Sequence, residues 1–342
     1  MNKIVFTGGG TLGHVMPNLY LIDSLIEKNE VAYIGSGGIE KSKIKSEGIE
    51  FYEIPAIKLV RGKILTNLKI PFVLLSSIFK AKKILSKIKP TVVFSKGGYV
   101  ALPVCIAARM LKISIVAHES DYSFGLANKL ILKLCSKMCV NFQHLEKLNK
   151  KIIYTGPIFS SDFDGNHKNT NFNLENNKPT ILIVGGSLGS KVINDNLFPI
   201  IKDIIKKYNI IHITGKGNLK VKSFENYNAI EQTNDMVGIY NLADFVIGRS
   251  GAGVTAECFY KRIPMLLIPL ENGVSRGDQL QNAKYYENLG VAKILREENL
   301  TPSKLEQAIY SFDFINKKNH YQNIKIDNGR NNVLKIIEEY LK

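Results

Sequence analysis

Short runs of apolar residues alternate with longer segments of helical apolar spacing along most of the chain. Lys3–Thr7 is the first run, and over His14–Lys28 the apolar positions follow a helical period. Further strands are predicted, each separated from the next by a helical segment, at Val31–Gly35, Phe51–Ile54, Thr91–Ser95 and Ser114–Ala117. This alternation is typical of βαβ units, whose strands form a parallel sheet covered by helices on both faces.

The same alternation starts again in the second half. Thr180–Val184 predicts a strand and about Val192–Lys206 a helix, and later strands are predicted at Ile210–Thr214, Phe245–Gly248 and Met265–Ile268. Both halves open with a strand followed by a glycine-rich turn. We therefore expect an α/β protein of two Rossmann-like, doubly wound domains that face each other across a cleft. Ligands of such sheets lie beyond the carboxyl ends of the strands.

Between the two series lies Phe159–Lys178, a segment rich in Asn, Asp and Ser that predicts a linker. It contains a D-x-D sequence, Asp162–Asp164, a spacing associated with metal-assisted sugar transfer. Because this sequence does not follow a strand, we interpret it as a solvated loop. No metal and no cofactor are expected. A last helix is predicted at about Asn332–Leu341.

Length and charge refine this picture. A chain of 342 residues suits two domains, and its net charge of +16 comes mostly from lysine. Segment Lys58–Lys89 mixes lysines with apolar residues such as Phe72 and Leu75. This mixture predicts either a helix lying on an anionic membrane or a core helix with a basic face. No apolar run reaches the roughly 18 residues of a membrane span, and the first residues predict a strand and no signal peptide.

Two other classes of site find little support. The four cysteines, Cys105, Cys135, Cys139 and Cys258, have no set of nearby ligands that would complete a metal site, and buried thiols in a reducing compartment are expected. Cys135 and Cys139 are four apart, which would place them on one side of a possible helix. No nucleic-acid-binding motif and no aromatic platform is present, so nucleic acid is not expected as a partner.

The first glycine-rich turn offers an anion site and a base. Gly8, Gly10 and Gly13 match G-x-G-x-x-G after a strand. The second strand ends at Ile34–Gly37 without the carboxylate that an NAD site requires, so the turn is expected to hold another anion or diphosphate. His14 stands at the helix start, where the dipole favours a neutral imidazole that can accept a proton. A capping or packing role is the alternative.

Two more strand ends in the first half carry polar or glycine-rich sequences. His118 and Glu119 follow a buried strand, and alternation along the strand predicts that at most one of them faces the cleft. Asn128 lies shortly afterwards. A third turn contains Gly97 and Gly98. Each of these is an ordinary turn when taken alone, but three on one sheet edge favour a site.

The second half has a matching edge. Arg249–Glu257 follows a strand with small residues that let a ligand approach a helix start, and Glu257 could accept hydrogen bonds from a ribose diol or simply stabilise the helix dipole. Gln279 and Asn282 lie three apart on one predicted helix face, with amides suited to hydroxyl groups.

Taken in order, these motifs resemble glycosyltransferase family 28. The resemblance covers nearly the whole chain and is specific as a combination, although each motif is weak alone. It is carried by the glycine-rich turn ending in His14, Gly97-Gly98-Tyr99, His118-Glu119, Gly125–Lys129, Gly185-Gly186-Ser187, Arg249–Ala252, Thr255-Ala256-Glu257 and Gln279 with Asn282-Ala283.

The resemblance implies a GT-B fold and an inverting, metal-independent transfer of N-acetylglucosamine from UDP-N-acetylglucosamine to lipid-linked undecaprenyl-diphospho-N-acetylmuramoyl-pentapeptide, in peptidoglycan synthesis. It implies a peripheral position at the cytoplasmic face of the cell membrane, and other wall-synthesis proteins are possible partners. The implied domains are residues 1–158, for the acceptor and the membrane, joined by a C-terminal helix of about 330–342, and residues 159–329, for the UDP-sugar.

By the same resemblance, His14 is the first choice for the catalytic base and Glu119 the second. The donor would be bound from the first domain by Thr11, Leu12, Gly13 and Asn128. In the second domain its diphosphate would meet Ser187 and the helix start at Ala252, Gly253 and Val254. Thr255 and Gln279 would contact sugar and phosphate, and Glu257 the ribose. The acceptor would bind at Gly9, Gly10, Gly97, Gly98 and Tyr99.

Two residues depart from the family pattern. Leu12 stands where the turn usually has a small residue, and Phe159 where an Arg is usual. Other readings stay open: a transferase with a different lipid acceptor, a UDP-sugar 2-epimerase, or a non-catalytic UDP-sugar-binding scaffold.

Overall fold

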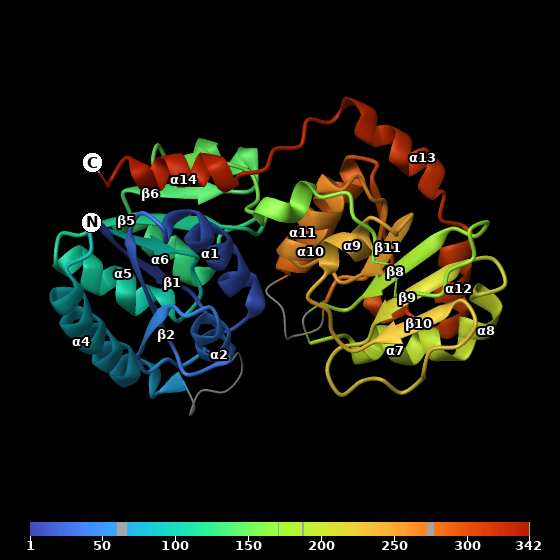
Figure 1. The fold of residues 1–342 in the computed structure, drawn as a ribbon, viewed down its shortest axis with the longest axis horizontal. Helices are drawn as coiled ribbons and strands as arrows, with labels where there is room; N and C mark the ends of the chain where they lie inside the picture. Colours follow the sequence, from blue (N-terminus) through green and yellow to red (C-terminus); the bar gives the residue numbers. More distant parts are fainter. Residues whose placement is uncertain (60–66, 170, 187, 272–276, 342) are drawn as a thin grey trace. The chain divides into compact units, whose positions relative to one another are not determined.

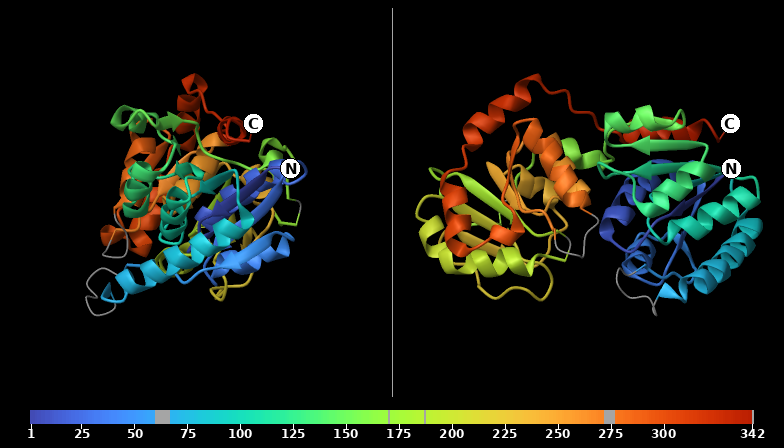
Figure 2. Two further views of the ribbon diagram at one scale, coloured as in Figure 1. Left: turned by 90° about the vertical axis from the view of Figure 1, so that its left-hand side faces the viewer. Right: turned by 180° about the vertical axis from the view of Figure 1, so that it is seen from behind.

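The structure is a computed structural model that describes residues 1–59, 67–169, 171–186, 188–271 and 277–341. Its internal contacts divide the chain into two compact units (Figure 1). Unit 1 comprises Met1–Ser161 and Asp327–Lys342, and unit 2 comprises Asp162–Ile326. Unit 2 is therefore an insertion into unit 1, and both chain ends belong to unit 1 (Figure 2).

Unit 1 is built on a parallel sheet. In its described residues the sheet has seven strands in the order β3-β2-β1-β4-β5-β6-β7, and every pairing is parallel. The strands are β1 (Lys3–Thr7), β2 (Glu30–Gly35), β3 (Glu50–Glu53), β4 (Val92–Ser95), β5 (Ser114–Glu119), β6 (Lys137–Val140) and β7 (Ile152–Tyr154). Because β1 lies between β2 and β4, the winding direction reverses beside it, which is where ligands of such sheets bind.

Helices cover both faces of this sheet. They are α1 (Leu12–Leu25), α2 (Ile39–Ser46), α4 (Ile70–Ile88), α5 (Ala101–Met110), α6 (Leu126–Leu134) and α14 (Arg330–Glu338), with a 3₁₀ turn η1 (Gln143–Leu148). One core cluster joins Phe6 of β1 and Val116 of β5 to Val15 of α1 and Val333 of α14. The final helix is thus part of the core of unit 1, as its place beside β6 in Figure 1 also shows.

Unit 2 repeats the plan with six described strands in the order β10-β9-β8-β11-β12-β13, all parallel. The strands are β8 (Thr180–Val184), β9 (Asn209–Ile213), β10 (Tyr227–Ile230), β11 (Phe245–Gly248), β12 (Met265–Leu267) and β13 (Ala292–Ile294). The helices are α7 (Lys191–Leu197), α8 (Ile201–Ile204), α9 (Met236–Tyr240), α10 (Ala252–Tyr260), α11 (Asp278–Asn288), α12 (Pro302–Tyr310) and α13 (Phe314–Asn319), and the 3₁₀ turns are η2 (Ser161–Asp164), η3 (Phe198–Ile200), η4 (Glu297–Asn299) and η5 (His320–Asn323).

The α/β fold class is confirmed, with differences in detail. The helix predicted at Val192–Lys206 is broken, because Pro199 interrupts it and the chain passes through η3. Cys135 and Cys139 do not share a helix, since Cys135 caps the end of α6 and Cys139 lies in β6. The expectation of buried thiols is confirmed: all four cysteines are buried and free, and burial raises the pKa of Cys135 to about 11.

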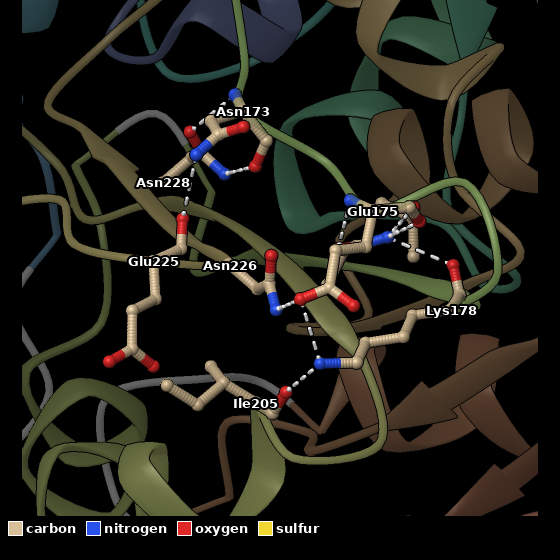
Figure 3. Close-up of polar contacts among 9 residues, drawn as sticks. Asn173, Glu175, Lys178, Ile205, Glu225, Asn226 and Asn228 are labelled. Atoms are coloured by element: carbon tan, nitrogen blue, oxygen red, sulfur yellow. Dashed lines mark hydrogen bonds and ion pairs between the residues drawn. The ribbon is translucent and has the colours of Figure 1, made fainter.

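Hydrogen bonds hold the segment that was predicted as a linker against unit 2. Figure 3 shows Glu175 bonded to Asn226 and Lys178, and Asn173 bonded to Asn228. The interpretation of Asp162–Asp164 as a solvated loop is wrong in part. This segment forms η2, Phe163 is buried, and Asp164 accepts a hydrogen bond from Tyr260 at 2.7 Å.

The chain leaves and re-enters unit 1 at adjacent points. Gly329 N donates to the Pro157 carbonyl at 2.7 Å, and a Cβ on Gly156 would lie 3.1 Å from the Asp327 carbonyl oxygen. Gly156 has φ of 81°, a conformation in which a side chain would be strained. At the other end of the sheet, Asn2 Nδ2 donates to the Leu341 carbonyl at 2.6 Å.

Asn209 makes three hydrogen bonds to the backbone of the predicted linker. Its buried side chain accepts from Glu175 N at 2.9 Å and donates to the carbonyls of Glu175 and Lys178, both at 2.9 Å. We expect Asn209→Ala to lower the free energy of unfolding of unit 2 by about 3 kcal/mol in urea titrations, because three hydrogen bonds to backbone groups are lost and the Glu175 carbonyl alone keeps another donor, Lys178 N. Asn226→Ala removes one bond, to the Glu175 side chain, and should lower it by about 1 kcal/mol. Equal effects would contradict this account.

Candidate functional site

Three turns of unit 1 follow β1, β4 and β5 at the carboxyl edge of the sheet, and two of them interlock. A Cβ on Gly98 would lie 3.2 Å from the Gly9 carbonyl oxygen and 3.4 Å from ring atoms of His14. A Cβ on Gly10 would lie 2.7 Å from the ring of Tyr99. Gly98 and Gly10 also have φ values of 83° and 84°, so glycine is required at both positions.

His14 lies in the first turn of α1, whose N-cap is Thr11. Its Nδ1 is 3.1 Å from the Gly9 carbonyl oxygen and 3.3 Å from Thr11 Oγ1. A carbonyl can only accept, so in this bond Nδ1 carries the proton and the lone pair of the neutral ring is on Nε2. In that tautomer, Nε2 is the ring atom that can accept a proton.

Glu119, the second choice for the base, is committed to holding a loop. It is buried at the end of β5, and its Oε1 accepts from Ser120 N at 2.9 Å and Asp121 N at 3.0 Å. Its Oε2 accepts from Gly125 N and Asn128 Nδ2, both at 3.0 Å. Four donors occupy the lone pairs of an ionised carboxylate, so accepting a substrate proton would disrupt the loop.

Asn128 belongs to the same hydrogen-bonded loop as Glu119. Its Nδ2 also donates to the His118 carbonyl at 3.1 Å, and a Cβ on Gly97 would lie 2.5 Å from its Oδ1. Asn128 is 4% exposed. The structure thus brings Asn128, Glu119 and the Gly97 turn together. What Asn128 has left for a ligand is Oδ1, which makes no hydrogen bond within the described part of the chain.

The sequence reasoning missed a carboxylate beside the first glycine-rich turn. Glu40, fully buried near the start of α2, accepts from Gly10 N at 3.3 Å and Ser36 N at 3.0 Å, and from the Ser36 hydroxyl. A Cβ on Gly9 would lie 2.7 Å from its carboxyl carbon. Its negative charge and burial both raise the pKa of Tyr99, burial more strongly. The charge also opposes an anion at Gly9 and Gly10, which weakens those two as acceptor contacts.

A second missed residue is Lys96, which follows β4 directly. Its side chain is 2% exposed, and Nζ donates to the Ser120 hydroxyl. Burial lowers its pKa to about 8, although the charges of Glu119 and Asp121 act in the opposite direction. Burial, and then the Lys96 charge, hold the pKa of His118 well below its ordinary value, against a smaller effect of the Gly156 backbone. A lysine between a buried strand and a Gly-Gly turn was the available signal.

Buried polar atoms without a hydrogen-bond partner gather in unit 1. In the described ranges they are Thr7 Oγ1, Asn18 Oδ1, both ring nitrogens of His118, Asn128 Oδ1 and Asn141 Oδ1. All of them lie at strand ends on the carboxyl edge or in the early turns of α1 and α6. Buried polar groups are normally paired, so their concentration at one edge makes it a candidate ligand-binding surface.

In unit 2, the turn after β8 is shaped by close backbone approach. A Cβ on Gly189 would lie 2.1 Å from the Thr214 carbonyl oxygen, and one on Gly185 would lie 2.3 Å from Ser190 N, so neither position tolerates a side chain. Leu188 is 79% exposed. Ser187, the predicted diphosphate contact in this turn, lies outside the described residues.

The other predicted diphosphate site is the start of α10. Ala252, Gly253 and Val254 form its first turn, and its N-cap Gly251 offers no side chain to cap the backbone N–H groups. A Cβ on Gly253 would meet no atom within 4 Å, so the turn faces open space. Uncapped N–H groups at a helix start are suited to a phosphate.

Thr255, a predicted donor contact, also has a bond within its own helix turn. It is fully buried, and its hydroxyl donates to the Gly251 carbonyl at 3.0 Å. This bond stabilises the first turn of α10. Gln279 in the first turn of α11 accepts from Leu270 N at 2.9 Å through Oε1, and its own carbonyl accepts from Ser250 Oγ at 2.8 Å. Its amide nitrogen is therefore the group left for a ligand's oxygen atoms.

Glu257 has a partner that the sequence did not reveal. Tyr240 at the end of α9 donates to its Oε2 at 2.8 Å. Burial raises the pKa of Glu257, while the bond from Tyr240 acts to lower it. The bond fixes the orientation of the carboxylate, and its second oxygen can accept a further hydrogen bond. Arg249 pairs with Glu297 and donates to the Ile268 carbonyl at 3.1 Å, which holds the ends of β11 and β12 together.

Within the described residues, no group of three or more His, Cys, Asp or Glu side chains is arranged to hold a metal ion. Nor does any helix in those ranges combine the length and apolar character needed to cross a bilayer.

Comparison with known proteins gives this geometry a context. The family model described as "Glycosyltransferase family 28 N-terminal domain" matches residues 4–140, and that described as "Glycosyltransferase family 28 C-terminal domain" matches residues 180–340. A crystal structure of Acinetobacter baumannii MurG superposes with a TM-score of 0.77 at 25% identity, covering 99% of this chain and all of that one.

Curated relatives are more similar still. One from Clostridium botulinum (strain Alaska E43 / Type E3) is 45% identical over 99% of this chain and 98% of its own length, and one from Clostridium tetani is 43% identical over the same shares. Both are named UDP-N-acetylglucosamine–N-acetylmuramyl-(pentapeptide) pyrophosphoryl-undecaprenol N-acetylglucosamine transferase.

The hydrogen bonds of Glu119 predict that this side chain contributes to the stability of the fold. In Glu119→Gln one oxygen becomes an amide that faces two N–H donors, so we expect the free energy of unfolding to fall by about 2–3 kcal/mol in urea titrations. Glu146→Gln is the matched control, because Glu146 accepts one bond, from Tyr154 N at 2.7 Å, which glutamine can keep. Unchanged stability with lost turnover would instead make Glu119 a catalytic residue.

Proposed function

Because the chain belongs to glycosyltransferase family 28, we propose that it transfers N-acetylglucosamine from UDP-N-acetylglucosamine to the N-acetylmuramoyl sugar of a lipid-linked, undecaprenyl-diphosphate acceptor. The identity of 45% over 99% of the chain, with a relative named for this reaction, is the observation that carries the proposal. The geometry supports it, since one edge of each unit gathers glycine turns and a helix start, which are suited to phosphate or sugar groups. The product belongs to peptidoglycan synthesis.

Unit 2 is proposed to hold the donor. The uncapped start of α10 at Ala252, Gly253 and Val254 would receive the diphosphate, and Glu257, oriented by Tyr240, would accept hydrogen bonds from the ribose. Gln279 would donate to the sugar or phosphate through its amide nitrogen. When the bond to the sugar breaks, the electron pair goes to the UDP oxygen, and the helix N-terminus stabilises that charge.

Unit 1 is proposed to hold the acceptor at the turns that contain Gly97, Gly98 and Tyr99. The acceptor hydroxyl attacks the anomeric carbon from the side opposite UDP, which inverts the configuration at that carbon. The hydroxyl proton passes to Nε2 of His14. Glu119 positions the loop before Asn128 in this scheme. Thr11, Leu12, Gly13 and Asn128 stay proposed donor contacts from unit 1.

We further propose that unit 1 lies on an anionic membrane surface through α4. Phe72, Leu75 and Phe79 lie on one helix face and are 78%, 54% and 59% exposed. Exposed lysines flank them at positions 69, 80, 83, 87 and 89. Between Glu53 and Glu119 the sequence contains no Asp or Glu, so no carboxylate offsets these charges within that stretch. Apolar residues flanked by lysines are suited to a lipid interface. Residues 60–66 of the predicted segment lie outside the described residues.

The transfer itself is tested with labelled UDP-N-acetylglucosamine and the lipid-linked muramoyl acceptor. We expect label in the acceptor lipid, with His14→Ala lowering kcat by roughly 10²–10⁴-fold and leaving the UDP dissociation constant unchanged, because the imidazole acts on the proton alone. Leu148→Ala, at an exposed position elsewhere in unit 1, is the control. Full turnover of His14→Ala would reject the base. Conversion of the free UDP-sugar without acceptor would favour an epimerase, and UDP binding without turnover a scaffold.

Membrane association is tested by vesicle flotation. Phe72→Asp combined with Leu75→Asp should weaken binding to vesicles containing anionic lipid by about tenfold or more, since two apolar side chains leave the interface and two negative charges enter it. The affinity for UDP should not change. Leu148→Asp is the matched control, because Leu148 is 64% exposed on another surface of unit 1. Equal losses in both proteins would reject α4 as the membrane contact.

A further inference from the structure

Glu40 is a buried carboxylate that has no part in the reaction as described so far. Three groups donate to it: Gly10 N at 3.3 Å, Ser36 N at 3.0 Å and the Ser36 hydroxyl. An ionised carboxylate can only accept, so three donors suit its charged form. Among the described residues no cation pairs with it, and the neighbouring Lys41 pairs with Glu53 at 2.6 Å. Its charge is therefore held by hydrogen bonds, and burial leaves it weakly screened.

Packing alone does not account for this charge. A Cβ on Gly9 would lie 2.7 Å from the carboxyl carbon of Glu40, so the carboxyl group lies directly against that glycine. A neutral side chain of similar volume could fill the same space without the cost of removing a charge from water. Buried charges without a counter-ion are characteristic of functional sites. We therefore asked which group near Glu40 gains from a negative charge.

One peptide group separates Glu40 from His14. The carbonyl of Gly9 accepts from His14 Nδ1 at 3.1 Å, and the N–H of Gly10 donates to Glu40. This carbonyl and this N–H belong to the same peptide bond, which is trans, so they point to opposite sides. The carboxylate and the imidazole therefore bind the two ends of one peptide dipole.

Hydrogen bonds in such a chain polarise one another. The charge of Glu40 draws electron density in the peptide toward the Gly9 oxygen, which makes this oxygen a stronger acceptor for the Nδ1 proton of His14. The bond from Gly10 N is long at 3.3 Å, so the change in each bond is modest. In a buried setting the charge also attracts an imidazolium directly, and more strongly than it would in water.

The start of α1 has the opposite effect on the same ring. His14 lies in the first turn of this helix, where the positive end of the helix dipole disfavours a protonated imidazole. A base that accepts a proton during the reaction becomes positively charged, so it needs compensation there. In the Ser-His-Asp triad a carboxylate in direct contact with Nδ1 stabilises the imidazolium. Here Glu40 is placed to do so through a peptide group.

We propose that Glu40 is a positioning residue of the reaction, which acts through the Gly9–Gly10 peptide to keep a proton on His14 Nδ1 and to stabilise the imidazolium. When Nε2 takes the proton of the acceptor hydroxyl, the hydroxyl oxygen forms the new bond to the anomeric carbon, and the bond to UDP breaks with its electron pair. Nδ1 keeps its proton, and none passes to Glu40. The catalytic part of this proposal rests on the proposed function, whereas the coupling of Glu40 to His14 does not.

In the described structure three further ionisable side chains lie against the first glycine-rich turn: Tyr33, Lys96 and Tyr99. Burial raises the pKa of both tyrosines and lowers the pKa of the lysine to about 8. Of these three, the lysine is the one that changes charge near neutral pH. It is present in every variant used below, so a difference between variants reports Glu40.

The test is an NMR titration of the full-length chain with isotope-labelled histidine, in which the His14 signal is identified by its loss in His14→Ala. We expect the Nδ1–H tautomer in the wild type at high pH. Glu40→Gln should lower the pKa of His14 by about 0.5–1, because the amide has no charge to stabilise the imidazolium. Glu40→Asp keeps the charge and should recover at least half of this fall. Glu47→Gln, which removes an exposed carboxylate at the end of the same helix, should leave the pKa unchanged.

Kinetics gives a second measurement. A weaker base should lower kcat of Glu40→Gln about tenfold and leave both KM values within about twofold of the wild type. Since the pKa of His14 falls in this variant, the acid limb of its kcat/KM profile should move to lower pH by the same amount. A purely structural change would lower kcat or raise KM and leave the acid limb in place.

Several results would overturn the proposal. One is an equal His14 pKa in Glu40→Gln and the wild type, and another is an Nε2–H tautomer in the wild type, which can be observed even where Glu40→Gln does not fold. A raised KM with unchanged kcat, or a lower kcat with an unmoved acid limb, would make Glu40 a structural residue. The titration uses no substrate. A His14 pKa that depends on Glu40 in a protein without transferase activity would therefore keep the coupling and reject the proposed function.

Discussion

Parallel pairing is the constraint on which the rest of the structure depends. Every described strand in both units runs parallel to its neighbours, so all turns that leave the carboxyl ends in a unit emerge along one edge. In each unit the order of the strands also reverses at the first strand. In unit 1, β1 lies between β2 and β4, and in unit 2, β8 lies between β9 and β11. The topology of the backbone alone therefore brings glycine turns and helix starts together at the carboxyl edge of each sheet.

Much of the fold was predictable because buried parallel strands appear in the sequence as continuous apolar runs. Thr180–Val184 and Phe245–Gly248 have the bounds that the sequence predicts. Strands β6, β7, β10 and β13 were not predicted, and in three of them a polar residue, Lys137, Asn228 or Lys293, interrupts the apolar run. The glycines at Gly10 and Gly98 were informative because their backbone conformation excludes other residues.

For the candidate site, the sequence predicts which positions lie at the carboxyl edges, but it does not predict what each side chain contacts. Thr255 and Glu119 stand in the expected motifs, yet the structure commits the first to a helix turn and the second to four N–H groups. Glu40 and Tyr240 act on glycine and carboxylate groups far away in sequence, so no local motif reveals them. The burial of Lys96 likewise depends on packing between three turns. Such roles follow from tertiary contacts, which spacing along the chain does not encode.

The insertion of unit 2 between Ser161 and Asp327 has a consequence for biosynthesis. A nascent chain has all of unit 2 available before α14 emerges from the ribosome, so unit 2 can fold while unit 1 is still incomplete. Val333 of α14 covers the face of the sheet that includes Phe6 and Val116. Until translation reaches this helix, those apolar side chains remain open to water or to chaperones. Unit 1 is therefore the last to complete its core, and premature termination before α14 would spare unit 2 alone.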